Sequence, residues 1–271
     1  MRYNLFRGEP MIFEHGGQSL YYERQGAGKP LLVLHGWGGR IESWLPVIRD
    51  FSALREVVAL DFPGSGRSPE PGEPWSVTEY MELTAALIRQ LDMAGVDILA
   101  HSFGARVAIL LAATHPELAG KLVLTGAAGL VPERTGKKRA RTTLYKALKG
   151  AAESAPVRAI LGEARVGAIR EALVQHFGSR DYRALTPGMR GTFNRVIRQD
   201  LRPCLPKIQS PALLIWGAKD TETPLWMGRV MEKEIPDAGL IVFEDAGHFA
   251  YLDRYPEFRA IVMKFLEESN A

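Results

Sequence analysis

Six short apolar segments, separated by stretches with helical periodicity, constrain the fold of this chain more than any other feature. Each has the length of a buried strand, and they begin at Leu31, Val57, Val96, Leu122, Ala212 and Leu240. Strands that alternate with helices predict a mostly parallel sheet covered by helices on both faces. Residues 11–22 add two short antiparallel strands around Gly16 and Gly17. The predicted fold class is therefore α/β.

The strand pattern stops between residues 132 and 200. This segment has the periodicity of several short helices, and turn-forming residues break it at Gly150, Pro156, Gly178 and Pro187-Gly188. Long inserts of this kind within a compact domain are usually functional lids. We therefore expect a core made of residues 1–131 and 201–271, and a helical cap, or lid, made of residues 132–200.

One predicted strand is joined to the following helix by a turn that contains a serine. Residues 96–100 are predicted to form a short, mainly apolar strand, Ala105 opens an apolar helical stretch, and Ser102 lies in the turn between them. The pattern is small-x-Ser-x-Gly, from Ala100 to Gly104, and small residues are required because strand and helix nearly touch. Such a turn lifts the serine side chain clear of both elements. An ordinary helix cap would also use serine at this point.

A serine hydroxyl becomes a nucleophile at neutral pH only with a base nearby and a carboxylate that orients the base. Both residue types follow later strands. Asp220 lies in the loop after the strand at 212–216, and His248 lies in the loop after the strand at 240–243. Because such loops line the ligand crevice of an open α/β sheet, we expect Ser102, Asp220 and His248 to face a common edge.

Five motifs occur in the order typical of one superfamily. They are LLVLHGWGG at 31–39, DFPGSGRS at 61–68, AHSFG at 100–104, WGAKDTETP at 216–224 and DAGHFAYLD at 245–253. In these motifs the chain resembles the α/β-hydrolases, the superfamily of esterases and lipases, from about residue 11 to residue 265. The resemblance implies the α/β-hydrolase fold, with Ser102 as the nucleophile, His248 as the general base and Asp220 as the acid that orients the base.

The chain departs from the usual motif at Ala100 and Ala105, where many relatives have glycine. Neither methyl group removes a reacting atom. The family stabilises the charge that develops on the substrate oxygen with two backbone N–H groups, one from the residue after the nucleophile and one from a loop after an early strand. The resemblance assigns these oxyanion-hole donors to Phe103 and Trp37, and the glycines around Trp37 leave its backbone free to turn.

Other polar residues near these motifs have structural interpretations. A histidine beside an oxyanion loop usually braces it, so we expect His35 to hold that loop and His101 to pack beside the serine turn. Asp61 begins a Pro-Gly-x-Gly turn and is expected to fix it through its carboxylate.

Two alternatives to Asp220 as the orienting acid are disfavoured. Asp245 is too near His248 in sequence to have the expected geometry. A carboxylate after the strand at 122–125 would also suit the family, but the chain has Gly126 and two alanines there.

Composition sets limits on class and location. The chain has 271 residues, 46% of them hydrophobic, which suits a globular α/β protein with one inserted cap. It contains no run of about 18 apolar residues, and its first ten residues lack the apolar core of a signal peptide. Cys204 is the only cysteine, so an internal disulfide is impossible. These features predict a cytoplasmic protein without a membrane span, and they leave the oligomeric state open.

No sequence motif indicates a cofactor or a metal. The glycine-rich segment at 34–39 is neither a dinucleotide-binding G-x-G-x-x-G nor a P-loop, and it is better explained as the oxyanion loop. Metal-ligand spacing is also missing from the sequence. We therefore predict a reaction that needs neither.

The predicted cap differs in charge from the core. Residues 132–200 contain 15 Lys and Arg against 6 Asp and Glu, a balance of +9 in a chain whose net charge is +3. The excess suits either a solvated helical surface or recognition of an anionic substrate, including one carried on an acidic protein. Together with HGWG at 35–38 it is similar to the esterases that release a pimeloyl methyl ester from acyl carrier protein. Nucleic acid is disfavoured because the charges are not interleaved with a known reading motif.

The resemblance implies a serine hydrolase that cleaves small-molecule carboxylic esters through an acyl-enzyme on Ser102. A carbon–carbon bond hydrolase and a cofactor-free perhydrolase with the same three residues remain alternatives, as does an esterase for esters on acyl carrier protein. Dehalogenases and epoxide hydrolases are excluded because they have Asp where this chain has Ser102. A different class is a non-catalytic receptor built on a hydrolase scaffold.

Overall fold

The computed structural model describes residues 9–131, 136–177 and 180–267. Its core is an eight-stranded sheet in the order β1-β2-β4-β3-β5-β6-β7-β8. The strands are β1 Glu9–His15, β2 Gln18–Gln25, β3 Pro30–Leu34, β4 Glu56–Asp61, β5 Val96–His101, β6 Ala119–Thr125, β7 Ala212–Gly217 and β8 Ala238–Phe243. The β1-β2 and β2-β4 pairs are antiparallel, and all other pairs are parallel. The predicted α/β class with a mostly parallel sheet is confirmed.

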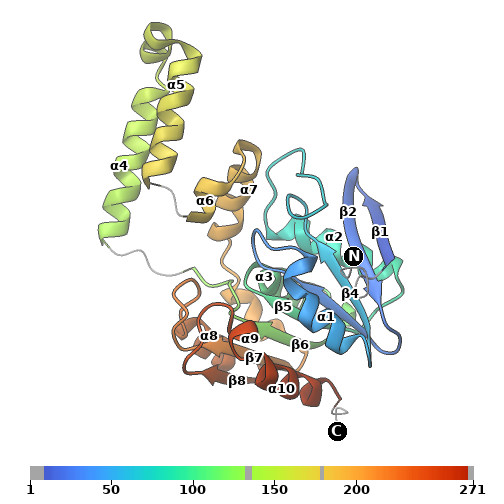
Figure 1. The fold of residues 1–271 in the computed structure, drawn as a ribbon. Helices are drawn as coiled ribbons and strands as arrows, with labels where there is room; N and C mark the ends of the chain where they lie inside the picture. The colour runs from blue at the N-terminus through green and yellow to red at the C-terminus, as the bar shows by residue number, and fades with distance from the viewer. Residues whose placement is uncertain (1–8, 132–135, 178–179, 268–271) are drawn as a thin grey trace, which may run out of the picture.

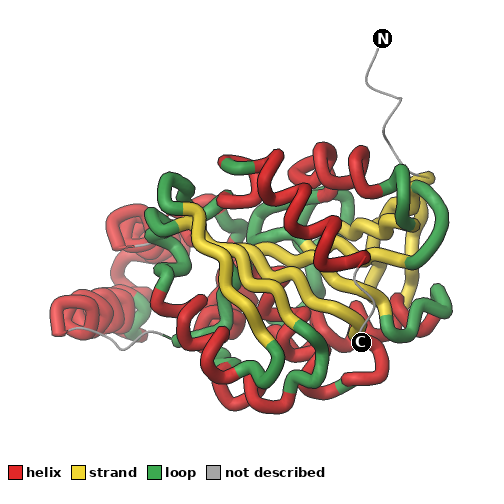
Figure 2. The backbone as a smooth tube through the Cα atoms, turned by 90° about the horizontal axis from the view of Figure 1, so that it is seen from below, coloured by secondary structure: helices red, strands yellow, loops and turns green. Residues whose placement is uncertain are grey.

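Helices cover both faces of this twisted sheet (Figure 2). The core helices are α1 Leu45–Phe51, α2 Val77–Gln90, α3 Phe103–Thr114, α8 Trp226–Glu234, α9 Ala250–Asp253 and α10 Tyr255–Glu267, with 3-10 turns at Ile41–Trp44, Pro116–Leu118 and Arg202–Lys207. Successive strand residues point to opposite faces. In β3, Leu32 and Leu34 join the hydrophobic cluster under α2 and α3, while Leu31 and Val33 join the one under α1 and α10. Burial on both faces explains why the parallel strands are mainly apolar.

The segment between β6 and β7 is helical, as expected, but two of its helices are long. They are α4 Gly136–Ala152, α5 Ala155–Phe177, α6 Arg180–Ala184 and α7 Pro187–Arg198. The prediction that Gly150 ends a helix is wrong, because Gly150 lies inside α4, where a glycine costs about 1 kcal/mol of helix stability without stopping the helix. The kink falls instead at Gly162 in α5, whose φ is 74°. Gly178 and residues 132–135, where the predicted cap begins, lie outside the described part of the chain.

Helices α4 and α5 pack against each other and project from the core (Figure 1). We call this pair the hairpin. Most of its described side chains face solvent, and Ile160 near the kink is 80% exposed. No helix among the described residues is both long enough and apolar enough to cross a membrane.

Helix α7, by contrast, is held tightly against the core. Its Thr192 Oγ1 accepts a hydrogen bond from the Trp75 N–H at 3.0 Å. At the end of α7, Arg106 of α3 donates to the carbonyl oxygens of Val196 at 3.2 Å and Gln199 at 3.0 Å, satisfying groups that a helix terminus leaves unpaired. Burial lowers the pKa of Arg106 to about 10, so the side chain stays charged at neutral pH. The helix that follows Ser102 is thereby tied to α7.

Candidate active site

Ser102 occupies a strained turn between β5 and α3. Its φ of 50° is rare for a residue with a side chain. The small neighbours are explained by close packing: a Cβ on Gly104 would lie 2.4 Å from the Leu34 carbonyl oxygen, and a Cβ on Gly36 would lie 3.3 Å from Ser102 Cβ. Helix α3 starts at Phe103, two residues earlier than the apolar pattern suggested, so the turn is even tighter than expected.

The backbone of Ser102 is fixed and its side chain is available. The Ser102 N–H donates to Thr125 O at 3.1 Å, and the Ser102 carbonyl accepts from Ala128 N–H at 3.2 Å. The side chain is half-buried and makes no capping bond to α3, so the helix-cap interpretation is wrong. Within the described residues, Ser102 Oγ makes no hydrogen bond.

Asp220 and His248 are brought together by neighbouring loops. Asp220 Oδ2 lies 2.8 Å from His248 Nδ1. The other oxygen, Oδ1, accepts the backbone N–H groups of Glu222 and Thr223, both at 2.9 Å. Burial opposes ionisation of this carboxyl, but hydrogen bonds from His248 and Thr223 outweigh it and hold the pKa of Asp220 below its usual range. The carboxylate is therefore ionised at neutral pH and oriented toward the imidazole.

Close backbone contact between the loops after β7 and β8 sets this geometry. The Lys219 N–H donates to Ala246 O at 3.0 Å. A Cβ on Gly217 would lie 2.2 Å from the Gly247 carbonyl oxygen, so only glycine fits there. Asp245 points elsewhere and forms an exposed ion pair with Lys219 at 3.1 Å. The structure thus brings Asp220, and not Asp245, to His248.

His248 lies beside the serine turn. Its side chain is 14% exposed, and its ring centroid is 4.6 Å from that of His101, the residue before Ser102. His101 Nδ1–H donates to Thr125 O at 3.0 Å. Burial, together with the nearby His248, lowers the pKa of His101 to about 3, so this ring is neutral at working pH. His101 packs beside the serine turn as predicted, between the turn and the loop that carries His248.

His35 and Asp61 have the structural roles predicted for them. His35 Nδ1 contacts Gly36 O at 2.7 Å and His35 Nε2 accepts from the Phe62 N–H at 2.9 Å, which ties the loop after β3 to the end of β4. Burial lowers the pKa of His35 to about 4, so this bridge stays neutral. The Asp61 carboxylate accepts the Ile41 N–H at 2.8 Å and the Arg67 N–H at 2.9 Å, fixing its turn.

Trp37 connects the loop after β3 to helix α7. Its indole packs edge-on against Phe103 at 5.1 Å and against Phe193 of α7 at 5.2 Å between ring centroids. Gly38 has a φ of 67°, which lets the loop turn beside it. Among the described residues, no acceptor is bonded to the Trp37 backbone N–H. The residue after Ser102, Phe103, is the first of α3, where backbone N–H groups have no partner within the helix.

Two residues at the site were missed by sequence reasoning. Phe193 contacts Trp37, and Thr223 Oγ1 contacts both Asp220 and His248. Thr223 lies in the motif WGAKDTETP at 216–224. Its position in that motif does not distinguish a threonine on the surface from one that faces Asp220. Phe193 belongs to a helix whose orientation depends on tertiary packing.

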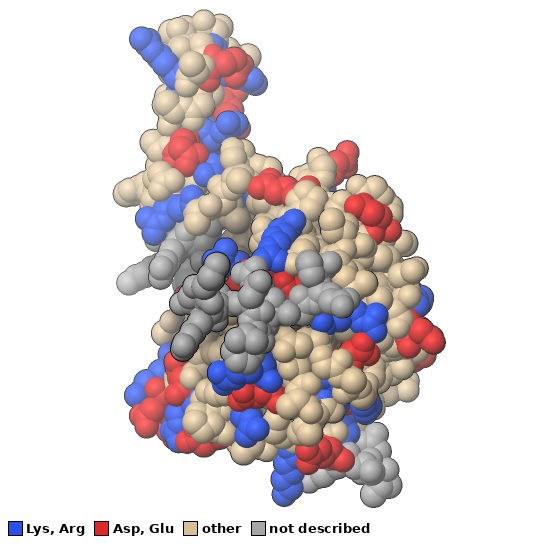
Figure 3. Space-filling view, turned by 45° about the vertical axis from the view of Figure 1, so that its right-hand side comes forward, with Lys and Arg blue, Asp and Glu red and all other residues tan. Residues whose placement is uncertain are grey.

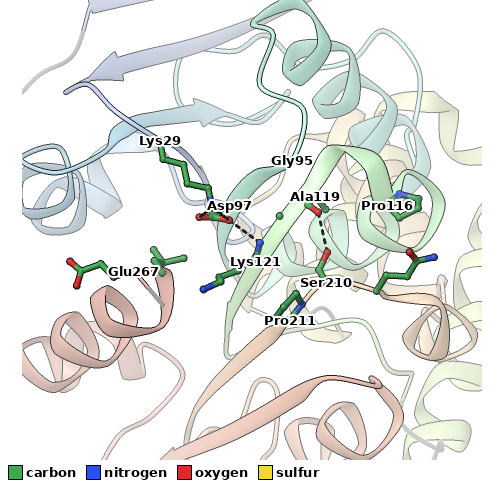
Figure 4. A pocket seen from close by; sticks show the side chains of 12 residues that line it. Lys29, Gly95, Asp97, Pro116, Ala119, Lys121, Ser210, Pro211 and Glu267 are labelled. Atoms are coloured by element: carbon green, nitrogen blue, oxygen red, sulfur yellow. Dashed lines mark hydrogen bonds and ion pairs between the residues drawn. The ribbon is translucent and has the colours of Figure 1, made fainter. Parts of the chain in front are cut away.

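A cavity of about 550 Å³ lies at the ends of the strands that are opposite to Ser102 (Figure 4). It opens between the starts of β5, β6 and β7, far along the strands from Ser102. Asp97, which lines it, is fully buried and paired with Lys29 at 2.9 Å and Arg55 at 2.6 Å. This buried carboxylate is neutralised by its own neighbours, and we assign the cavity no part in the chemistry.

The charge on the hairpin is partly neutralised locally. Arg158 pairs with Glu163, and Arg190 of α7 pairs with Glu171 of α5. Basic and acidic side chains are interspersed over the hairpin surface seen in Figure 3. The basic run at 137–141 has side chains outside the described set. The charge excess of residues 132–200 is therefore established from the sequence and not from the described side chains.

The sequence matches one protein-family model and is similar to several bacterial proteins. The family model described as alpha/beta hydrolase fold matches residues 29–255. A dihydrolipoyllysine-residue acetyltransferase component of an acetoin cleaving system from Pseudomonas putida is 28% identical over 96% of this chain and 70% of its own. A pimeloyl-(acyl-carrier protein) methyl ester esterase from Neisseria meningitidis is 30% identical over 88% of this chain and 94% of its own.

Solved structures show the same fold. The crystal structure of an alpha/beta hydrolase enzyme from a Medee basin deep-sea metagenome library superimposes with a TM-score of 0.73. The two chains are 21% identical, and the match covers 96% of this chain and 98% of the other.

Proposed function

The chain belongs to the α/β-hydrolase family, and from this premise we propose that it is a serine hydrolase that cleaves carboxylic esters through an acyl-enzyme on Ser102. The observation that carries the proposal is the 2.8 Å contact between Asp220 Oδ2 and His248 Nδ1, beside the strained serine turn. The relative from Neisseria meningitidis, named as a methyl ester esterase, supports ester hydrolysis as the reaction type.

In the proposed reaction, Asp220 holds His248 with Nδ1 protonated, so that Nε2 is free to accept a proton. His248 takes the proton of Ser102 Oγ as the oxygen attacks the ester carbonyl, and it returns that proton to the departing alcohol. Water then repeats the cycle on the acyl-enzyme, with His248 again as the base. The contact between Ser102 and His248 need not exist before substrate binds, because catalytic hydrogen bonds often tighten only in the complex.

The backbone N–H groups of Trp37 and Phe103 are proposed to bind the oxygen that becomes negative during attack. Their support is the position of the loop after β3, where a Cβ on Gly36 would lie 3.3 Å from Ser102 Cβ. Removal of one such donor in a comparable site costs about 3 to 4 kcal/mol of transition-state stabilisation.

We further propose that residues 132–200 form a cap over this site and that residues 1–131 and 201–271 form the core. The contact of Phe193 with Trp37 supports the cap, since it places a residue of α7 beside the proposed oxyanion loop. An apolar or aromatic acyl group would meet these two rings.

We also propose that the protein is cytoplasmic. Fractionation of the cells that produce it tests this location.

Ester hydrolysis is tested by assay with p-nitrophenyl esters of graded acyl length. We expect turnover with at least the short and medium acyl chains, and a burst of p-nitrophenol equal to the enzyme concentration where deacylation is slow, since an acyl-enzyme is formed first. The assay would also rank acyl lengths. Cleavage of a vinylogous diketone with no turnover of any ester would replace this proposal by carbon–carbon hydrolysis.

The basic excess of the cap predicts a preference for anionic esters. If the charge acts on substrate, an ester ending in a free carboxylate should be cleaved about tenfold faster than a neutral ester of equal length. The ratio should fall as salt rises, because charges more than about 8 to 10 Å apart are screened at physiological ionic strength. Replacing Lys137, Lys138, Arg139 and Arg141 with glutamate should reduce kcat/KM for the anionic ester alone. A preference independent of salt would show that these charges only keep the cap soluble.

A further inference from the structure

Thr223 lies where the three loops of the site meet. It follows β7 in the chain, the residue is 5% exposed, and Thr223 Oγ1 is 2.8 Å from Asp220 Oδ2. The same oxygen is 2.9 Å from the Gly126 carbonyl oxygen, in the loop after β6. It is also 3.2 Å from His248 Nδ1, in the loop after β8. One hydroxyl therefore contacts both members of the acid–base pair and the backbone of a third loop.

The hydroxyl has a single proton, so its direction must be decided between two acceptors. Asp220 is ionised and Gly126 offers a neutral carbonyl, and hydrogen bonds to a charged acceptor are about twice as strong. Whichever acceptor takes the proton, lone pairs of Thr223 Oγ1 face the other oxygen, and the repulsion is greater from the ionised Asp220 Oδ2 at 2.8 Å than from the neutral Gly126 carbonyl at 2.9 Å. The Thr223 O–H therefore donates to Asp220 Oδ2, the atom that also accepts His248 Nδ1–H.

These bonds complete the shell around the carboxylate. Asp220 Oδ1 accepts two backbone N–H groups, and Oδ2 accepts Thr223 and His248. With four donors placed, the carboxylate cannot rotate without breaking several of them. Gly126 makes room for this arrangement, because a Cβ at that position would lie 3.3 Å from His248 Nδ1 and 3.4 Å from Asp220 Oδ2.

We propose that Thr223 is a positioning residue for the proposed hydrolase reaction: its hydroxyl holds Asp220 Oδ2 in line with His248 Nδ1. The inference rests on the proposed function and goes beyond it, since Thr223 acts through its contacts with Asp220 and His248. Holding the acid in line keeps the proton on Nδ1 and leaves Nε2 free for catalysis.

The test compares two substitutions with opposite expectations. Thr223→Val keeps the shape and removes the hydroxyl, so kcat should fall about 10- to 100-fold, the range expected for a lost hydrogen bond to a charged group, while KM should stay within about twofold. Thr223→Ser keeps the hydroxyl and loses a methyl group, so kcat should remain within about threefold of the wild type. A role in packing alone predicts the reverse, with the valine variant active and the serine variant impaired.

Two further variants keep the experiment decisive. Thr223→Ala also lacks the hydroxyl, and it is expected to reproduce the loss in kcat if the valine variant fails to fold. Thr84→Val is a matched control: Thr84 is buried in α2 and its hydroxyl donates to the Tyr80 carbonyl at 2.8 Å, away from the site. This control should retain full kcat.

The readouts separate failure of this inference from failure of the proposed function. A wild-type protein that cleaves esters and reacts with a fluorophosphonate, alongside an equally active Thr223→Val variant, overturns the role of Thr223 alone. A folded wild-type protein that neither cleaves esters nor reacts with the probe overturns both. A loss of kcat in the valine and alanine variants that serine avoids supports the positioning role.

Discussion

Replacing Ser102 with alanine is expected to abolish covalent labelling by a fluorophosphonate and to reduce kcat for esters by about 10⁶-fold, as loss of the nucleophile does in a comparable site. The physical reason is that alanine lacks the hydroxyl oxygen that attacks the probe or the ester. No other hydroxyl is proposed to lie between His248 and the proposed oxyanion loop. The measurement is the mass of the intact protein after reaction, together with ester turnover. The wild type should gain a single adduct, and Ser102→Ala none.

The fold should survive this change, because Ser102 makes no capping hydrogen bond and its backbone contacts are unaffected by the substitution. Ser154→Ala, at a serine between the two helices of the hairpin, is a suitable control and should label and turn over normally. Labelling that persists in a folded Ser102→Ala protein would mean that the nucleophile lies elsewhere.

Asp220→Asn is expected to reduce kcat about 10⁴-fold, by analogy with the same change in a serine–histidine–aspartate site. Two backbone N–H groups, from Glu222 and Thr223, point at Asp220 Oδ1, so the amide oxygen of asparagine will occupy that position. The amide NH₂ must then face His248 Nδ1. Because an NH₂ group donates, Nδ1 must accept and cannot carry the ring proton. That proton is then on Nε2, and the ring can no longer receive a proton from Ser102.

A matched variant isolates this effect. Asp245→Asn makes the same chemical change in the loop of His248, but Asp245 is exposed and paired with Lys219. It should retain the wild-type rate. Full activity in Asp220→Asn, or a large loss in Asp245→Asn, would show that the orienting acid has been assigned wrongly.

The sheet could be predicted from sequence because each strand carries its own signal. Leu31 and Leu32 of β3 are buried on opposite faces, as are their counterparts in neighbouring strands, so a mainly apolar run was sufficient to identify each parallel strand. Glycines at 16 and 17, both with positive φ, likewise marked the turn between β1 and β2. The length of the helices between β6 and β7 was misjudged because a glycine such as Gly150 weakens a helix without ending it.

The triad residues could be proposed from sequence for a topological reason. Parallel strands end at one edge of the sheet, so residues directly after β5, β7 and β8 are brought together whatever their separation in the chain. Their assignment as Ser102, Asp220 and His248 stays a prediction until the substitutions above are made. The family itself is established, since its model spans residues 29–255.

By itself, then, the sequence determined the fold class, the strand order along the chain and the loops that carry the candidate chemistry, because these depend on local periodicity and on residues adjacent to strand ends. Tertiary structure alone decided which side chains surround Asp220 and where helix α7 contacts the loop after β3. Thr223 contacts the nearby Asp220 through one side-chain rotamer. Phe193 contacts Trp37 through packing between segments that are far apart in the chain. Such contacts cannot be recognised from the periodicity of the sequence. They depend on how loops and helices are placed relative to one another, and not on the residue pattern within any one of them.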